Sequence, residues 1–280
     1  MKGEGGKRPK IWVERIPGPF ASIYEKATRM VRETYYVPVA EEVVSFLASG
    51  RVLDLGTGPG CLPVEIAKRS SHIRVEGIDL SRRLIETARS NAGRAGVGDR
   101  VHFEVGDASR LMRDDDTYDM VISTGMLHIL KDPVRVLKEC RRVLKPGGNA
   151  WIYDPARVCS QVDIRKWKAA FSHREWIYYG LFLLFARINP GRTYDRGQVA
   201  AMVKAAGFGN YDIREEGGEI RARMTKGSVF RQAPGRLNSS VVTSLFLQSV
   251  EICAICGSFC CYYWWPGIAL YPFPTLLMRK

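Results

Sequence analysis

The sequence predicts an α/β fold in which buried parallel strands alternate with helices. Residues 51–67, RVLDLGTGPGCLPVEIA, run from an apolar strand through a glycine loop into a helix. Further apolar segments follow at the spacing expected of successive strands, at residues 75–78, 101–105 and 120–122. Acids stand in or just after the first three segments, and these are Asp54, Asp79 and Asp107. Because parallel strands end at one edge of a sheet, these acids are expected to gather there.

The glycine loop itself indicates a nucleotide site. Gly56, Gly58 and Gly60 permit a tight turn and let a ligand approach the backbone without meeting a Cβ atom. The helix that follows directs its amino end toward the same crevice. A dinucleotide fingerprint has its third glycine where Cys61 stands here, which disfavours a pyrophosphate site. Taken alone, the loop leaves a phosphate or dinucleotide site and a purely structural turn open.

An acid just before a GxGxG loop resembles motif I of the class I S-adenosylmethionine-dependent methyltransferases. Asp79 comes about twenty residues after the loop, where an acid is placed to accept hydrogen bonds from two ribose hydroxyls. The resemblance further implies that Leu80 lies on the adenine face and that Asp107 contacts the adenine amino group. The segments YDMVISTGM and VLKPGG are also typical of this family.

The resemblance covers roughly residues 20–226 and is closest to the ubiquinone and menaquinone biosynthesis type, with a type 11 methyltransferase domain. It implies a Rossmann-like, seven-stranded, mostly parallel sheet flanked by helices, with an antiparallel edge and a helical insertion after strand five. S-adenosylmethionine is the implied cofactor. The implied cofactor-binding residues are Asp54, Gly56, Thr57, Gly58, Gly60, Asp79, Leu80, Asp107, Ala108 and Ser123.

The chain is predicted to be one catalytic domain with additions at both ends. Residues 1–19 form an extension, residues 155–195 an acceptor-site insertion, and residues 227–280 an apolar, cysteine-rich tail outside the core fold. Prolines in the tail argue against an unbroken membrane helix, and its CxxC lacks a second ligand pair, so no metal site is predicted. The odd total of seven cysteines favours reduced thiols and a cytoplasmic protein. Peripheral membrane contact through the tail or insertion is the alternative.

The net charge of +13 is unevenly distributed. Residues 51–154 carry 17 basic and 15 acidic side chains, whereas residues 155–226 carry 13 basic and 7 acidic ones. The basic excess therefore belongs to the part expected to face the acceptor. It is consistent with an acidic acceptor group, with RNA binding, or with a solvated surface that keeps the protein soluble.

The predicted activity is in-line methyl transfer to a small, lipophilic acceptor, since the insertion contains the apolar run WIYYGLFLLFARI. His128 is the candidate general base, and its alternative role is packing or loop anchoring. Other side chains expected near the acceptor or over the cleft are Tyr24, Tyr35, Tyr36, His173, Tyr178 and Tyr179. A nucleic-acid methyltransferase and a non-catalytic S-adenosylmethionine-binding protein remain alternative functions, and the sequence indicates no oligomeric state.

Overall fold

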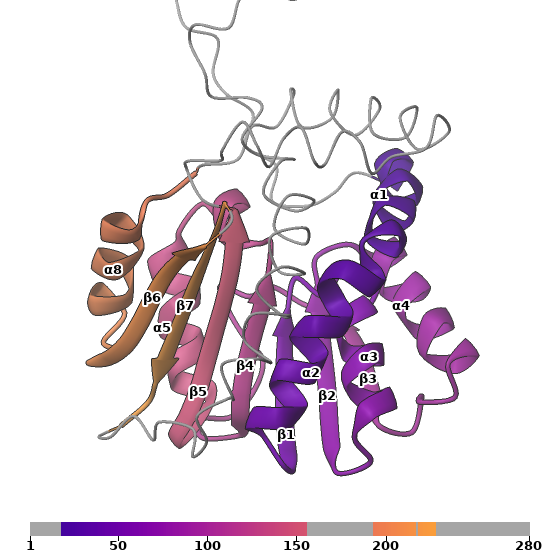
Figure 1. Cartoon of the computed structure of the whole chain (residues 1–280), viewed down its shortest axis with the longest axis horizontal. Helices are drawn as coiled ribbons and strands as arrows, with labels where there is room; N and C mark the ends of the chain where they lie inside the picture. The colour runs from indigo at the N-terminus through magenta and orange to yellow at the C-terminus, as the bar shows by residue number, and fades with distance from the viewer. Residues whose placement is uncertain (1–17, 156–192, 217, 228–280) are drawn as a thin grey trace, which may run out of the picture.

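The computed structural model describes residues 18–155, 193–216 and 218–227 of the chain (Figure 1). Seven strands form a single sheet in the order β3-β2-β1-β4-β5-β7-β6. The strands are β1 (Gly50–Leu55), β2 (Ile73–Asp79), β3 (Val101–Val105), β4 (Tyr118–Thr124), β5 (Leu144–Pro155), β6 (Asn210–Glu216) and β7 (Glu219–Thr225). The helices are α1 (Gly18–Met30), η1 (Arg32–Tyr36), α2 (Val37–Phe46), α3 (Cys61–Arg69), α4 (Arg82–Arg94), η2 (Leu127–Ile129), α5 (Pro133–Val143) and α8 (Arg196–Ala205).

Strands β1 to β5 pair in parallel, which confirms the mostly parallel sheet. The antiparallel strand is β7, which lies one place in from the edge strand β6 and runs against both of its neighbours. The strand order reverses direction between β1 and β4, because β1 is followed in the sheet by β2 on one side and by β4 on the other. Open α/β sheets bind ligands at such a switch point, outside the carboxyl ends of the strands.

Two apolar cores lie on opposite faces of the sheet, because successive side chains of a strand point to opposite sides. In β1, Val52 joins the core covered by η1, α2, α3 and α4, while Leu53 and Leu55 join the core covered by α5 and α8. All three side chains are fully buried, and each stabilises the fold by roughly 1.5–3 kcal/mol. The near-continuous apolar run of this strand follows from burial on both faces.

Strand β7 alternates apolar side chains with charged ones, of which Glu219 is buried and Arg221 and Arg223 are partly exposed. Its Ile220, Ala222 and Met224 enter one core, while Glu219, Arg221 and Arg223 alternate with them. Glu219 is 2% exposed and accepts a hydrogen bond of 2.7 Å from the hydroxyl of Tyr35 in η1. The guanidinium of Arg221 lies 2.7 Å from the same carboxylate. These polar side chains fasten the amino-terminal helices to the far half of the sheet.

The segment VLKPGG, residues 143–148, joins helix α5 to strand β5 without a separate turn. Helix α5 ends at Val143 and β5 begins at once with Leu144, which pairs with Tyr118. The pairing then resumes at Asn149 opposite Met120, so residues 145–148 bulge from the strand. The polar and glycine residues of this segment therefore shape a bulge inside β5.

Most of the predicted insertion and, apart from Gly227, the predicted tail lie outside the described residues. His173, Tyr178, Tyr179 and the tail cysteines are among them. Within the described ranges, no helix combines the length and apolar character needed to cross a membrane.

Gly60 is required by both its backbone conformation and its surroundings. It caps α3 with φ +75°, and a Cβ atom there would stand 2.6 Å from Cζ of Phe103 and 2.9 Å from Cβ of Ala88. We expect Gly60→Ala to lower the free energy of unfolding by about 2–4 kcal/mol, through backbone strain and overpacking together. Gly96→Ala is the matched control, because Gly96 has φ +68° with open space around it, and should cost only about 1–2 kcal/mol. Equal shifts of the two urea midpoints would contradict the packing argument.

Candidate functional site

A cavity of about 310 Å³ opens at the carboxyl ends of β1, β2 and β3 and extends under the loop after β4. Five predicted cofactor residues line it, and these are Gly56, Asp79, Leu80, Asp107 and Ala108. The structure therefore brings together three strand ends that lie far apart in the sequence. Leu80 presents an apolar side chain that is 36% exposed in this crevice, next to the acid that ends β2.

The Asp79 carboxylate is fixed by two backbone donors. Its Oδ2 accepts a hydrogen bond of 3.0 Å from the Gly58 amide, and its Oδ1 accepts one of 2.8 Å from the Ser81 amide. Burial raises the pKa of Asp79, while these two amides oppose the rise. Each carboxylate oxygen can accept a second hydrogen bond. Asp79 thus joins the glycine loop to β2 and keeps acceptor capacity directed at the crevice.

Asp107 is held in a similar way at the end of β3. Its Oδ1 accepts a hydrogen bond of 2.8 Å from the Ser109 amide, an Asx-type turn that orients the carboxylate. Ala108, the residue between them, is 8% exposed and lines the same cavity. The loop after β3 therefore contributes one acid and one small residue to the crevice.

Asp54 and Thr57 lie behind the cavity lining. Asp54 is 2% exposed and Thr57 is 7% exposed. Among the described residues, neither Oδ1 of Asp54 nor Oγ1 of Thr57 has a partner in hydrogen-bond geometry. Burial raises the pKa of Asp54 to about 7, with the nearby Thr57 hydroxyl opposing the rise and the charge of Asp79 adding to it. A buried unpaired carboxyl beside a glycine loop is costly unless a ligand or water satisfies it.

This raised pKa predicts a pH-dependent stability. A carboxyl whose pKa rises from 3.8 to about 7 on folding stabilises the protein below pH 4 and loses that contribution as the pH rises through 7. We expect Asp54→Asn, without cofactor, to be more stable than the unmodified chain at pH 8 by a few kcal/mol, at about 1.4 kcal/mol per pKa unit. Urea unfolding at pH 5 and pH 8 measures the effect. An unchanged pH slope in the variant would contradict it.

The remaining predicted cofactor residues shape the crevice from outside its lining. Gly58 has φ +54° and would bring a Cβ atom to 3.2 Å from the Tyr24 ring. Gly60 packs against Phe103, as described above. Ser123 is 1% exposed, and its hydroxyl donates a hydrogen bond of 2.9 Å to the Leu55 carbonyl. Ser123 therefore connects β4 to β1 inside the sheet.

Several lining residues were not among the predicted cofactor residues. Tyr24 reaches the cavity from α1, and Met126 approaches Gly56 so closely that a Cβ atom there would meet its sulfur at 2.8 Å. The other wall comes from η2 and the first turns of α5, with Ile129, Leu130, Lys131, Asp132, Arg135 and Val136. The sequence contains a signal for this wall, because residues 126–130, MLHIL, are mostly apolar and lie between β4 and α5. Tyr35 and Tyr36, expected to close the cleft, are instead buried in the core beside α2.

His128 lies in η2, between the lining residues Met126 and Ile129, and pairs with an acid at the end of β5. Its Nδ1 is 3.0 Å from Oδ1 of Asp154, and its backbone amide donates to the same oxygen at 3.2 Å. Asp154 is 2% exposed. A carboxylate at Nδ1 favours the tautomer protonated there, which leaves Nε2 as the basic nitrogen. The pair joins the ends of β4 and β5, one strand away from the glycine loop.

Comparisons with known proteins agree with this geometry. A family model described as a methyltransferase domain matches residues 52–148. Over 107 residues the chain is 36% identical to 27-O-demethylrifamycin SV methyltransferase of Amycolatopsis mediterranei, covering 38% of this chain and 39% of that protein. Over 117 residues it is 32% identical to the ubiquinone/menaquinone biosynthesis C-methyltransferase UbiE of Geotalea daltonii, covering 41% and 49% of the two chains. The chain thus spans less than half the length of these two relatives.

A solved structure shows the same fold over a longer stretch. It is a protein of Methanococcus maripaludis, described as a putative S-adenosyl-L-methionine-dependent methyltransferase. The match has a TM-score of 0.59 and 19% identity, and covers 82% of this chain and 100% of that one. The sheet order, the glycine loop and the methyltransferase-domain match over residues 52–148 together support a class I S-adenosylmethionine-dependent methyltransferase.

Proposed function

We propose that this chain transfers the methyl group of S-adenosylmethionine to a small, lipophilic acceptor. The observation that carries the proposal is that Asp79, Leu80 and Asp107 line one crevice. The Asp79 carboxylate is held there by two backbone amides. A nucleoside needs acceptors for its ribose hydroxyls and an apolar face for its base. The lining supplies both.

The residues present fit the cofactor in two further respects. Two buried oxygen atoms at the glycine loop, Oδ1 of Asp54 and Oγ1 of Thr57, lack hydrogen-bond partners among the described residues. An ionised Asp54 would offset the positive charge of a cationic ligand bound at this loop. Gly56 lines the crevice, and a Cβ atom there would meet the sulfur of Met126 at 2.8 Å, so glycine is required at this point of the loop. We therefore assign Asp79, Leu80, Asp107 and Ala108 to direct cofactor contact. Asp54, Thr57, Gly58, Gly60 and Ser123 shape the loop and the strand ends around it.

S-adenosylmethionine supplies a methyl group on a positively charged sulfur, which an acceptor atom displaces in line. The contribution of the protein is to position the acceptor and exclude water, and the apolar wall of Met126, Ile129 and Leu130 suits that role. His128 is proposed as the general base, taking the acceptor proton on Nε2 while Asp154 stabilises the resulting imidazolium. No residue of the chain needs to form a covalent intermediate.

The lipophilic character of the acceptor rests on the apolar sequence of the predicted insertion and on the names of two relatives, which refer to a rifamycin and to quinones. The insertion, residues 155–195, begins with Pro155, the last residue of β5, so it starts directly after Asp154, the partner of His128. We place acceptor selection there.

Two measurements on the full chain test the proposal. Isothermal titration calorimetry should show saturable binding of S-adenosylhomocysteine. Transfer from methyl-labelled S-adenosylmethionine should then be scored over hydroxylated macrolactones, quinols and total RNA. Transfer to a lipophilic small molecule supports the proposal. Transfer to RNA alone would favour the nucleic-acid alternative, and binding without turnover on any acceptor would favour a cofactor-binding protein.

A further inference from the structure

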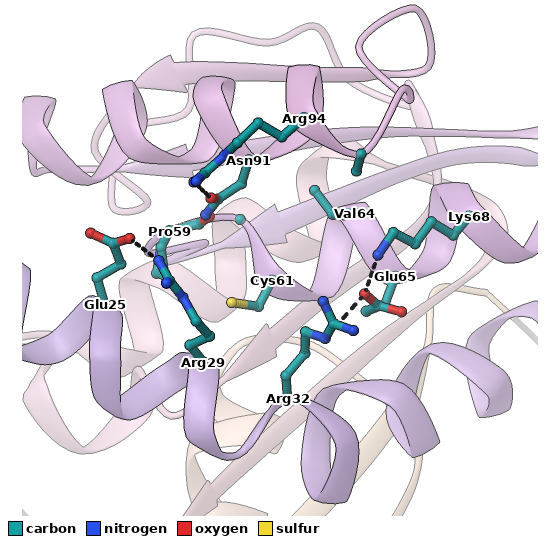
Figure 2. A pocket seen from close by; sticks show the side chains of 12 residues that line it. Glu25, Arg29, Arg32, Pro59, Cys61, Val64, Glu65, Lys68, Asn91 and Arg94 are labelled. Atoms are coloured by element: carbon teal, nitrogen blue, oxygen red, sulfur yellow. Dashed lines mark hydrogen bonds and ion pairs between the residues drawn. The ribbon is translucent and has the colours of Figure 1, made fainter. Parts of the chain in front are cut away.

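A second cavity lies on the other side of the glycine loop, walled by α1 and η1 on one side and by α3 and α4 on the other (Figure 2). It holds about 260 Å³ and shares no lining residue with the crevice described above. Pro59 and Gly60 of the loop line this cavity, whereas Gly56 lines the crevice. The loop thus has a cavity on each side, and the proposed function uses only one of them.

The second cavity has an excess of positive charge. Its lining includes the four cations Arg29, Arg32, Lys68 and Arg94 and only two carboxylates, Glu25 and Glu65. The cations come from four different elements, so they surround the space rather than run along one helix face. In Figure 2 the side chains of Arg29 and Arg94 extend from opposite walls toward Pro59.

Both carboxylates are already engaged by neighbouring cations. Glu65 is 2% exposed and lies 2.9 Å from Nζ of Lys68 and 2.5 Å from Nη1 of Arg69. Although burial opposes it, the hydrogen bonds from Lys68 and Arg69 hold the pKa of Glu65 below its ordinary value. Glu25 lies 2.6 Å from Nη2 of Arg29. Neither acid is available to neutralise the opposite wall.

Arg94 is the cation that these acids leave uncompensated. Its Nη2 donates to the neutral Oδ1 of Asn91 at 2.5 Å, and no described carboxylate forms an ion pair with it. Asn91 in turn donates from Nδ2 to the Pro59 carbonyl at 2.8 Å. A guanidinium has five N–H donors, so Arg94 keeps most of them for a ligand. Asn91 therefore links the Arg94 guanidinium to the glycine loop and fixes its position.

The chemistry of the lining also limits what can bind. Burial raises the pKa of the Cys61 thiol to about 11, so this thiol is neutral at physiological pH and does not act as a nucleophile. The positive charge disfavours a cationic sulfonium. An anion with several acceptor oxygens matches the guanidinium donors best, because arginine recognises phosphate through paired hydrogen bonds.

We propose that this cavity is a second ligand site that binds a phosphate group, either as inorganic phosphate or as a phosphate monoester. Arg94 and Arg29 hold the phosphate oxygens from opposite walls, while Lys68 and Arg32, which pair with Glu65 and Glu33, lie beside them. The site is separate from the methyl donor. Its ligand lies against the loop segment whose other end borders the donor crevice.

Calorimetric titration of the full chain at constant ionic strength tests this site. The arms are inorganic phosphate, glycerol 3-phosphate, and phosphatidylcholine vesicles with or without phosphatidic acid, which distinguish a free phosphate from a lipid headgroup. We expect saturable binding that Arg94→Gln weakens about tenfold or more, because a hydrogen bond to a charged group is lost. Arg29→Gln should weaken it similarly, and its side chain is 61% exposed, so this variant should fold.

Arg82→Gln is the matched control, since Arg82 is an exposed arginine of α4 that lines neither cavity. It should retain phosphate affinity, and all three variants should bind S-adenosylhomocysteine as the unmodified chain does. Non-saturable heat signals with every phosphate ligand and vesicle would overturn the proposal. Equal weakening by Arg82→Gln would do so as well, because it would show general surface attraction. Neither result would affect the proposed methyl transfer, which is measured separately.

Discussion

Asp79→Ala is expected to weaken S-adenosylhomocysteine binding by about 100-fold or more. The carboxylate is proposed to accept hydrogen bonds from the ribose hydroxyls, and a hydrogen bond to a charged group contributes roughly 1.5–3 kcal/mol. Each 1.4 kcal/mol is a factor of ten in affinity. The variant also removes the acceptor of the Gly58 amide, which positions the glycine loop. Calorimetric titration of the folded variant gives the change directly.

Two further variants sharpen this test. Asp79→Asn keeps one oxygen for an amide but replaces the other by a donor, so an intermediate loss is expected. Asp99→Ala removes a carboxylate whose side chain is 71% exposed, and should leave affinity unchanged. An Asp79→Ala variant that binds the cofactor product as tightly as the unmodified chain would show that the ribose site is elsewhere.

His128→Gln is expected to lower kcat by about 10²–10⁴-fold, the contribution typical of general-base catalysis. Glutamine can retain a hydrogen bond to Asp154 but cannot take a proton from the acceptor. Because His128 does not line the donor cavity, the affinity for S-adenosylhomocysteine should stay within about twofold. The measurement is single-turnover transfer to the acceptor identified in the panel.

Two further variants, at Asp154 and at the exposed His102, provide the controls for His128→Gln. Asp154→Asn should also reduce kcat, since the imidazolium formed during transfer would lose its carboxylate. His102→Gln changes an exposed histidine of β3 and should have no effect. Full turnover in His128→Gln would instead assign His128 to anchoring the loop after β4, the alternative role considered from the sequence.

The donor half of the site was predictable because its signals are local. Gly56 and Asp79 each stand at a strand end that is marked by an apolar run, and parallel strands must bring such ends to one edge. The same rule applied to β5 would have found Asp154, an acid that directly follows the apolar residues 150–153. That acid gives His128 its partner.

Other parts of the site depend on packing between distant segments. Nothing in the sequence near Tyr35 indicates that its hydroxyl meets Glu219, because the two residues are 184 positions apart. The sequence does not indicate β7, because Glu219, Arg221 and Arg223 interrupt its apolar residues. Their partners in the fold, which include Tyr35, Glu42 and Trp151, come from distant segments. The cavity that contains Arg94 likewise exists only where α1, α3 and α4 meet.

By itself the sequence determined the fold class, the order of the strand ends and the family of the donor site, because backbone periodicity and glycine loops are encoded over short stretches. The tertiary structure decided which of those residues share a cavity. It placed Asp79 and Leu80 in the crevice, Ser123 inside the sheet, and His128 against Asp154. The physical reason is that burial, pairing and charge balance are properties of side chains from distant segments, and they take their values only after the chain has folded.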